Sequence, residues 1–356
     1  MTNNLRSTVI VQDRLNTYGG GERVINELLD TIPGEVDIIT GDYDPSSTYD
    51  FSRCNVVELK QNTFLSFIKS RLTMDWSDYD LAILSGNRPQ FIQCLELPIP
   101  TIRYCHSPTR TFWSLRDRDF RNAGLQGKLA RTIIAPVYRS LDAFLNKRHN
   151  KIIANSHNTR SQVDRFYGLE ASVAYPPVDT DDFEYSPHNG YWLSVNRLVP
   201  KKRIDLQIDT FKNIDEELVI IGAVDQKHSE YGQRVASQIN TISNIRLEKS
   251  VSQERLVSLY SNAKGVLYTP VYEDFGIVPI EAMASGKPVV TVAEGGPVET
   301  VHDQQTGWLV APTASEIRQQ VTSDFNEEEF RSACLVRAKQ FDTGRFKSKV
   351  LSEISQ

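Results

Sequence analysis

Short runs of apolar residues alternate along the chain with segments whose apolar residues recur every three or four positions. The run Val9–Val11, for example, is followed by glycines and then by Val24, Ile25 and Leu28 at helical spacing. This alternation is typical of a parallel sheet covered by helices. In the first half of the chain, further strands are predicted at residues 36–40, 80–85, 101–105 and 152–155.

The alternation is interrupted by the proline-containing segment Ala174–Val178 and the polar stretch Asp179–Gly190, and then begins again. The second half carries predicted strands at residues 191–195, 218–221, 245–247, 265–268 and 288–292. Two such blocks joined by a linker indicate an α/β protein with two doubly wound, Rossmann-like domains. We predict one domain over residues 1–180, a second over 188–335, and a terminal helix over 340–356 that is too polar to form a core of its own.

Length and composition agree with this organisation. The 356 residues suit about two domains of roughly 150 residues each. With 40 basic and 45 acidic residues the net charge is −5, so the overall charge gives no argument for nucleic-acid binding. The four cysteines form no Cys-x-x-Cys pair, which disfavours a zinc cluster or a disulfide framework. Residues 1–8 are polar and no run of about 18 apolar residues occurs, so we expect a cytoplasmic protein without a membrane span.

The segment from Glu273 to Glu281 is the most informative stretch. It follows a predicted strand, and a helix is expected to begin near Gly276, because Pro279 is tolerated only in a first turn. The N–H groups of residues 275–278 would then face the ligand edge of the sheet, where a helix start attracts phosphate. One carboxylate could contact a hydroxylated group and the other a ribose. The alternative is that both acids only complement the helix dipole, an effect of about 0.3–1 kcal/mol each.

Arg197 and Lys202 form a second candidate site, directly after the first predicted strand of the second domain. They lie five residues apart across a turn at Pro200, so that both cations could approach one anion. Arginine offers phosphate oxygens a planar fork, and lysine offers a point charge. The alternative is a solvated basic turn, which we expect for the flanking Lys201 and Arg203.

Two further candidates follow predicted strands of the first domain. The glycines Gly19–Gly21 lack the Lys-Ser/Thr of a Walker loop but allow a ligand to approach the backbone closely; the alternative is a tight turn. His106 ends the strand at 101–105, where its ring could bond a polar ligand or serve only the structure. Its neighbour Cys105 should point to the opposite face, so a Cys–His nucleophile is not expected.

The region from Ser114 to Lys151 differs in charge from the rest of the chain. It contains nine basic and three acidic residues, a net charge of +6, with apolar residues interleaved. A basic amphipathic stretch of this kind can rest on an anionic membrane surface, which would make the protein a peripheral membrane protein. The alternative is an ordinary solvated helix face.

Taken in order, these motifs resemble the retaining glycosyltransferases of family 4, which have the GT-B fold, two Rossmann-like domains that face a central cleft. The resemblance is carried by Gly20-Gly21-x-Arg23, His106, Arg197 with Lys202, Glu273-x7-Glu281 around Phe275-Gly276, Gly295-Gly296-Pro297-x-Glu299 and Thr306-Gly-Trp-Leu-Val310. The stretches Tyr104–Arg110, Ile153–Ser156 and Tyr175–Asp179 are similar to a mannosyltransferase-type subgroup.

The resemblance implies transfer of a hexose, with mannose suggested by the subgroup, from a GDP- or UDP-linked donor to a glycan or lipid-linked acceptor. Arg197 and Lys202 would hold the donor diphosphate, while Glu273 and His106 would contact the donor sugar. The leaving phosphate would take the acceptor proton, so no side-chain base, metal ion or cofactor is expected. The terminal helix would cross back to the first domain. Further donor-binding residues would be Gly19, Gly20, Gly21, Val251, Phe275, Gly276, Ile277, Val278 and, at the ribose, Glu281.

Two departures from the family pattern leave the nucleobase open. Relatives often have Gly-x-Gly-Pro where this chain has Gly222-Ala-Val-Asp225, and often have glycine where Lys249 stands. Both positions lie near the expected base pocket, so guanine and uracil both remain. Two alternative functions also remain at this point, a nucleotide-sugar epimerase of the same fold and a non-catalytic module that binds a nucleotide sugar.

Overall fold

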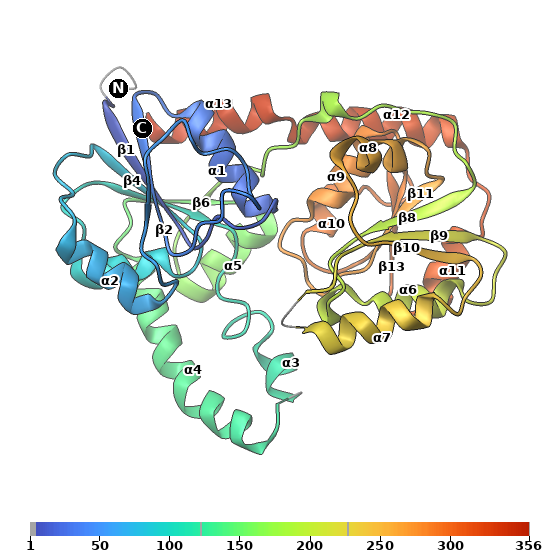
Figure 1. Ribbon diagram of the computed structural model, residues 1–356, viewed down its shortest axis with the longest axis horizontal. Coiled ribbons are helices and arrows are strands. Elements are labelled where there is room, and N and C mark those ends of the chain that lie inside the picture. Colours follow the sequence, from blue (N-terminus) through green and yellow to red (C-terminus); the bar gives the residue numbers. More distant parts are fainter. Residues whose placement is uncertain (1–4, 122, 226–227, 356) are drawn as a thin grey trace. The chain divides into compact units, whose positions relative to one another are not determined.

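The computed structural model describes residues 5–121, 123–225 and 228–355. The chain divides into two compact units, of which unit 1 comprises Met1–Pro177 with Gly344–Gln356 and unit 2 comprises Val178–Thr343 (Figure 1). Each unit is built around one parallel sheet with helices on its faces. The predicted α/β fold with two doubly wound units is therefore confirmed.

The sheet of unit 1 has seven parallel strands in the order β3-β2-β1-β4-β5-β6-β7. The order reverses between β1 and β4, and in such sheets ligands bind outside the carboxyl ends of the strands at this reversal. Strand β1 is buried on both faces, since Ile10 packs into one apolar cluster while Val9 and Val11 pack into another. The strands are β1 (Ser7–Gln12), β2 (Glu35–Thr40), β3 (Val56–Glu58), β4 (Leu81–Ser85), β5 (Thr101–Cys105), β6 (Lys151–Ala154) and β7 (Ser172–Val173).

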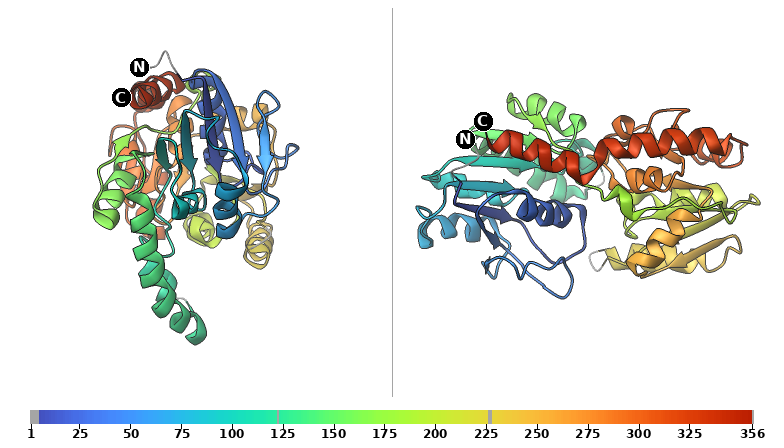
Figure 2. Two further views of the ribbon diagram at one scale, coloured as in Figure 1. Left: turned by 90° about the vertical axis from the view of Figure 1, so that its left-hand side faces the viewer. Right: turned by 90° about the horizontal axis from the view of Figure 1, so that it is seen from above.

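The helices of unit 1 include one from the end of the chain. Phe346 and Val350 of α13 pack into the same cluster as Ile10, so the last helix completes this core. Helix α4 packs on the rest of the unit through residues such as Tyr138, Asp142 and Leu145, and it also extends away from the sheet of its own unit (Figure 2, left). The helices are α1 (Gly20–Thr31), α2 (Phe64–Thr73), α3 (Arg116–Arg121), α4 (Leu125–Asn146), α5 (His157–Tyr167) and α13 (Thr343–Ile354), with a 3₁₀ segment, η2, at Pro89–Leu95.

Unit 2 contains a six-stranded parallel sheet in the order β10-β9-β8-β11-β12-β13, with its reversal between β8 and β11. Its strands are β8 (Tyr191–Val195), β9 (Glu217–Ile221), β10 (Ile245–Glu248), β11 (Gly265–Tyr268), β12 (Val289–Val292) and β13 (Gly307–Val310). Its helices are α6 (Ile204–Phe211), α7 (Ser229–Ile239), α8 (Gln253–Ser261), α9 (Ile277–Ala284), α10 (Pro297–Thr300), α11 (Ala314–Val321) and α12 (Glu327–Ala338). Short 3₁₀ segments lie at η3 (Thr180–Asp182), η4 (Pro200–Lys202) and η6 (Lys339–Phe341).

Three strands were not expected from the sequence, namely β3, β7 and β13. All three lie at the edges of their sheets and have two to four residues. Strands β3 and β7 have only three and two residues, so their apolar runs are too short to stand out. In β13 the apolar run Trp308–Val310 is present and was overlooked.

Candidate functional site

The reversal point of the unit 2 sheet brings a lysine and a glutamate together. Lys202 lies in η4 after β8, and Glu273 lies in the loop after β11. Lys202 Nζ donates to Glu273 Oε2 at 2.6 Å, and the two side chains are only 17% and 24% exposed. The ammonium group also lies 5.3 Å from the ring centroid of Tyr268. The sequence places these residues 71 positions apart, and the sheet makes them one half-buried charge pair.

The loop that carries Glu273 is held by the two glycines of the Gly-Gly-Pro motif. Gly296 N–H donates to the Glu273 carbonyl oxygen at 2.7 Å. A Cβ atom at Gly295, whose φ is +68°, would lie 2.2 Å from the same carbonyl oxygen. A Cβ atom at Gly296 would lie 2.4 Å from the Cα of Phe275. Both distances are far below van der Waals contact, so only glycine permits this backbone packing.

Arg203 also fixes this loop, and the expectation that it is a solvated charge was wrong. Its guanidinium donates to both carboxylate oxygens of Glu294, at 2.9 and 3.0 Å, and it is 21% exposed. Glu294 in turn accepts a hydrogen bond from the backbone N–H of Tyr272, at 3.4 Å. Arg203 and Tyr272 have φ values of +51° and +43°, an uncommon conformation for residues with a side chain. The expectation failed because the partner acid is 91 residues away in sequence.

Arg197 has a different environment from Lys202. It follows β8, its side chain is 72% exposed, and its Nη1 lies 3.5 Å from Asp225 Oδ2. Each of the two predicted phosphate-binding cations thus faces an acid, Lys202 facing Glu273 and Arg197 facing Asp225. Asp225 stands where the Gly-x-Gly-Pro pattern has proline. The acid that faces Arg197 is therefore one of the residues by which this chain differs from that pattern.

Helix α9 begins at Ile277, with Gly276 as its N-cap residue at φ +91°, as the sequence predicted. Ile277 and Val278 form the first turn and are half-buried, while Phe275 is buried and packs edge-on against Phe341. Further along, Glu281 is 5% exposed and accepts a hydrogen bond from Tyr260 Oη at 2.8 Å. Glu273 and Glu281 thus differ in surroundings: the first faces a lysine, and the second is held by a phenol within the fold. Val251, the remaining predicted donor contact of unit 2, is half-buried in the loop between β10 and α8.

In unit 1 the glycine loop and His106 meet at one place. Gly19 is the N-cap residue of α1, and Gly20 and Gly21 begin the helix. A Cβ atom at Gly21 would lie 3.9 Å from Cε1 of His106, so the two predicted site segments are neighbours. A Cβ atom at Gly19 would lie 2.5 Å from Glu22 Oε2, so a side chain there is excluded unless Glu22 moves.

His106 is held in the neutral state by its surroundings. Burial, with a smaller contribution from the charge of Arg103, lowers the pKa of its imidazole to about 4. Its Nε2 lies 2.9 Å from Ser85 Oγ, and its ring packs edge-on against Tyr104. Cys105 lies instead in an apolar cluster with Val163, as expected for a residue on the other face of the strand.

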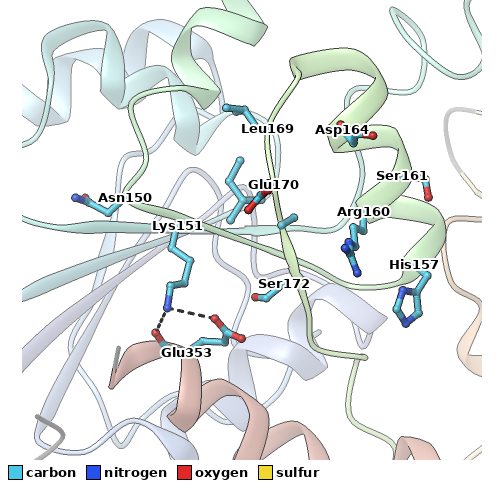
Figure 3. Close-up of a pocket in the computed structure, with 12 residues that line it drawn as sticks. Asn150, Lys151, His157, Arg160, Ser161, Asp164, Leu169, Glu170, Ser172 and Glu353 are labelled. Carbon is cyan, nitrogen blue, oxygen red and sulfur yellow. Dashed lines mark hydrogen bonds and ion pairs between the residues drawn. The ribbon is translucent and has the colours of Figure 1, made fainter.

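A separate open hollow of about 870 Å³ lies in unit 1. It is formed by the start of β6, the segment before β7, helix α5 and Glu353 of α13 (Figure 3). Lys151 Nζ donates to the backbone carbonyl of Glu353 at 2.7 Å and lies 3.2 Å from its carboxylate. Its lining includes none of the predicted site residues, and the ion pair of Lys151 with Glu353 fastens α13 to the sheet.

Two further features concern only the residues that the structure describes. Among them, no three histidine, cysteine, aspartate or glutamate side chains are grouped so that they could hold a metal ion. Within the same described ranges, no helix combines the length and the apolar character needed to cross a bilayer.

Two family models match consecutive parts of the chain. The model of glycosyltransferase family 4 matches residues 18–182, and the model of glycosyl transferases group 1 matches residues 183–341. Together they extend over both units. The chain belongs to glycosyltransferase family 4.

Curated relatives of this family 4 chain are named alpha-1,3/1,6-mannosyltransferase ALG2. The Saccharomyces cerevisiae protein is 28% identical over 263 residues, which are 58% of this chain and 50% of the relative. The Dictyostelium discoideum protein is 25% identical over 376 aligned positions, which are 91% of this chain and 85% of the relative. The Candida glabrata protein is 31% identical over 49% of this chain and 51% of the relative. The chain thus spans about half the length of most of these relatives.

Solved structures confirm the GT-B fold of this family 4 chain. HepE from Anabaena, in complex with UDP and glucose, is similar with a TM-score of 0.78 and 17% identity, covering 98% of this chain and 99% of that one. Sucrose-phosphate synthase from Thermosynechococcus elongatus gives a TM-score of 0.79 and 16% identity, covering 99% and 98%. At these identities the likeness concerns the fold.

Some residues around the family 4 motifs were missed by sequence reasoning. Ser85 follows the rule used for the others, since it ends β4 at the sheet reversal, but a lone serine attracts no notice. Gln12 ends β1 in the same way, and a Cβ atom at Gly21 would lie 3.6 Å from its Nε2. Asp225 and Glu294 were missed because an acid becomes informative only once its cation is known.

Proposed function

We propose that the protein is a retaining hexosyltransferase that moves a sugar from a nucleoside diphosphate sugar to a glycan or lipid-linked acceptor. The observation that supports this best is the half-buried pair of Lys202 and Glu273 at the sheet reversal of unit 2, beside the start of α9. A lysine there suits a diphosphate, a carboxylate suits sugar hydroxyls, and a helix start adds N–H donors for phosphate.

In this proposal the reaction is driven by electrostatic stabilisation of the leaving group. Lys202 and Arg197 balance the negative charge that grows on the nucleoside diphosphate as the bond to the sugar breaks. Glu273 orients the sugar through its hydroxyl groups, aided by the backbone of residues 275–278, and Glu281 binds the ribose. The leaving phosphate takes the acceptor proton, which keeps departure and attack on one face of the sugar and retains the configuration.

His106 would act as a neutral hydrogen-bonding group beside the donor sugar. Its lowered pKa keeps the ring uncharged at neutral pH, so the ring adds no positive charge near the reacting carbon. Gly21 lies next to it, which would let the donor approach the backbone of unit 1. Gln12 and Ser85 border the same place and would orient the ring and the donor.

The relatives support mannose as the transferred sugar, because the proteins from Saccharomyces cerevisiae and Dictyostelium discoideum are named as mannosyltransferases. The same names favour transfer over an epimerase or a non-catalytic module. For the nucleoside, both GDP and UDP are to be tested, since the base pocket of this chain departs from the family pattern at Asp225 and Lys249.

The test is a transfer assay with GDP-mannose, UDP-glucose and related donors, against a lipid-linked oligosaccharide acceptor. Proton NMR of the anomeric signal would show whether the product keeps the donor's configuration. Lys202→Ala should reduce turnover by about 10²–10³-fold, as expected for loss of one charge-stabilising group. Lys201→Ala is the matched control, because Lys201 is the exposed neighbour of Lys202. An inverted product, or a Lys202→Ala enzyme as active as the control, would refute the mechanism.

A further inference from the structure

Helix α4 of unit 1 turns an apolar face outward. Large apolar residues recur every four positions on it, and all are at least 37% exposed: Leu125, Leu129, Ile133, Val137 and Leu141. Ile134 and Phe144 extend this outward face and are 53% and 51% exposed. Residues four apart lie on one side of a helix, so these side chains form a continuous stripe. In an ordinary surface helix this side would be polar.

The orientation of α4 is fixed by contacts on its opposite side. Asp142 is fully buried and accepts hydrogen bonds from Gln90 Nε2 at 2.6 Å, from Trp113 Nε1 at 2.6 Å and from Tyr167 Oη at 2.8 Å. Tyr138 stacks on Phe112 with their ring centroids 4.1 Å apart. Rotating the helix to hide the apolar stripe would break this network. The packing of unit 1 therefore keeps the apolar stripe exposed.

A small cationic pocket lies between α3 and α4, beside the stripe. It has a volume of about 260 Å³ and apolar walls that include Phe112, Phe120 and Pro136. Three arginines, Arg116, Arg131 and Arg139, and one acid, Asp117, also line it, and Arg116 Nε lies 3.2 Å from Asp117 Oδ1. Nη1 of Arg131 is buried and has no hydrogen-bond partner among the residues that the structure describes. A buried guanidinium nitrogen without a partner is costly, so the pocket is suited to an anion.

The combination of charge and apolar surface selects the occupant. A second copy of this chain would bring two segments of charge +6 together, which would repel. A nucleotide sugar would need more room, because pockets for such ligands usually measure about 300–1,000 Å³. An anionic bilayer satisfies both features, since its interface takes up an apolar helix face and its lipids carry phosphate.

We propose that α3 and α4 form a membrane-docking surface, in which the apolar face of α4 lies in the interface of an anionic bilayer and the arginine pocket binds a lipid phosphate. The lipid phosphate then gives Arg131 its missing acceptor, and Arg139 adds charge, while Arg116 is paired with Asp117. This proposal does not depend on the enzymatic activity. It assigns the membrane contact to named residues and adds a headgroup site that the charge count alone does not indicate.

The test is co-sedimentation of the full chain with extruded vesicles of phosphatidylcholine alone or with 30 mol% phosphatidylglycerol. Wild-type protein should bind only the anionic vesicles, and less as salt rises from 0.05 to 0.5 M. Val137→Gln should weaken binding about tenfold, because the polar glutamine loses the apolar contact that valine makes with the bilayer interface. The matched control is Val336→Gln on α12, because Val137 and Val336 are 68% and 70% exposed. Equal effects of the two variants would overturn the docking face.

The headgroup site is tested separately from general charge. Lys128→Gln with Lys147→Gln removes two charges outside the pocket and should weaken binding about 30-fold, at about 1 kcal/mol per charge. Arg131→Gln with Arg139→Gln removes two charges within the pocket. This double variant should bind at least tenfold more weakly than the Lys128/Lys147 double variant. Equal losses in the two double variants would overturn the lipid-phosphate site. Light scattering without lipid tests for self-association. If the wild-type chain is a dimer and Val137→Gln dissociates it, the apolar face of α4 binds a second copy of the chain, and the proposal is overturned.

Discussion

Replacing Glu273 by glutamine should strengthen the binding of the bare nucleoside diphosphate while weakening sugar transfer. In the structure the carboxylate of Glu273 neutralises Lys202 across 2.6 Å. If Lys202 binds the donor diphosphate, the diphosphate must share or displace this partner. Glutamine keeps the size of the side chain and removes the competing charge, so Lys202 becomes fully available to phosphate.

The size of the effect follows from the burial of the pair. Exposed ion pairs contribute about 0.2–1 kcal/mol, and breaking a fully buried pair costs about 3–5 kcal/mol. The side chains of Lys202 and Glu273 are 17% and 24% exposed, which places their coupling between these limits, at about 1–2 kcal/mol. Release of that coupling would tighten diphosphate binding by about 5- to 30-fold, since 1.4 kcal/mol corresponds to a factor of ten.

Isothermal titration calorimetry with GDP and with UDP measures the affinity directly. The set needs four proteins: wild type, Glu273→Gln, Lys202→Met and the double variant. Lys202→Met should weaken binding, and Glu273→Gln should no longer help in the double variant, because the group that it frees is gone. Transfer by Glu273→Gln should fall at least 100-fold, since the carboxylate's contact with the sugar is lost.

The reasoning would be refuted if Glu273→Gln bound the diphosphate no better than wild type while Lys202→Met bound it normally. That result would mean that the pair serves only to hold the loop after β11. Thermal denaturation then distinguishes the two roles, because a purely structural pair lowers the stability of both single variants and leaves diphosphate affinity unchanged.

Three other measurements follow from the same structure. The imidazole of His106 should titrate with a pKa of about 4 in NMR spectra; because the unfolded chain binds this proton near pH 6.5, stability should fall as pH drops from 6.5 to 4, and less so in His106→Gln. Tyr260→Phe should lower the free energy of unfolding by about 1.5–3 kcal/mol, because buried Glu281 loses a hydrogen bond to its carboxylate; urea denaturation followed by fluorescence measures this. Arg203→Lys keeps the charge that pairs with Glu294 but removes Nη1, which donates to the backbone carbonyls of Thr269 and Pro270, so calorimetry should show a lower melting temperature than wild type; an unchanged one would contradict a role of Arg203 in holding this loop.

The central strands and the helix start at Gly276 were predictable because their causes are local. Val9 to Val11 are buried on both faces of the sheet, so they form an uninterrupted apolar run. Gly276 has φ +91°, which favours glycine, and Pro279 fits only a first turn. Each of these features depends on a few adjacent residues.

The remaining features depend on residues that are distant in sequence. Arg203 was expected to be solvated because Glu294 lies 91 residues away, and no local pattern joins them. The stretch around α4 was recognised as basic and amphipathic, but which side faces outward is decided by what Asp142 contacts. Periodicity shows that a helix has two unlike sides, and only packing shows which of them is covered.

Unit 1 is made of two segments that are distant in sequence, and this affects the order in which the units are completed during synthesis. Its core needs Phe346 and Val350, yet all of unit 2 is translated between Pro177 and these residues. At about 5–20 residues per second, the ribosome reaches α13 roughly 8–30 seconds after the rest of unit 1 has been made. The ribosome therefore completes the sequence of unit 2 before it completes the sequence of unit 1. Until then, the apolar surface that α13 will cover stays open to chaperones and to other nascent chains.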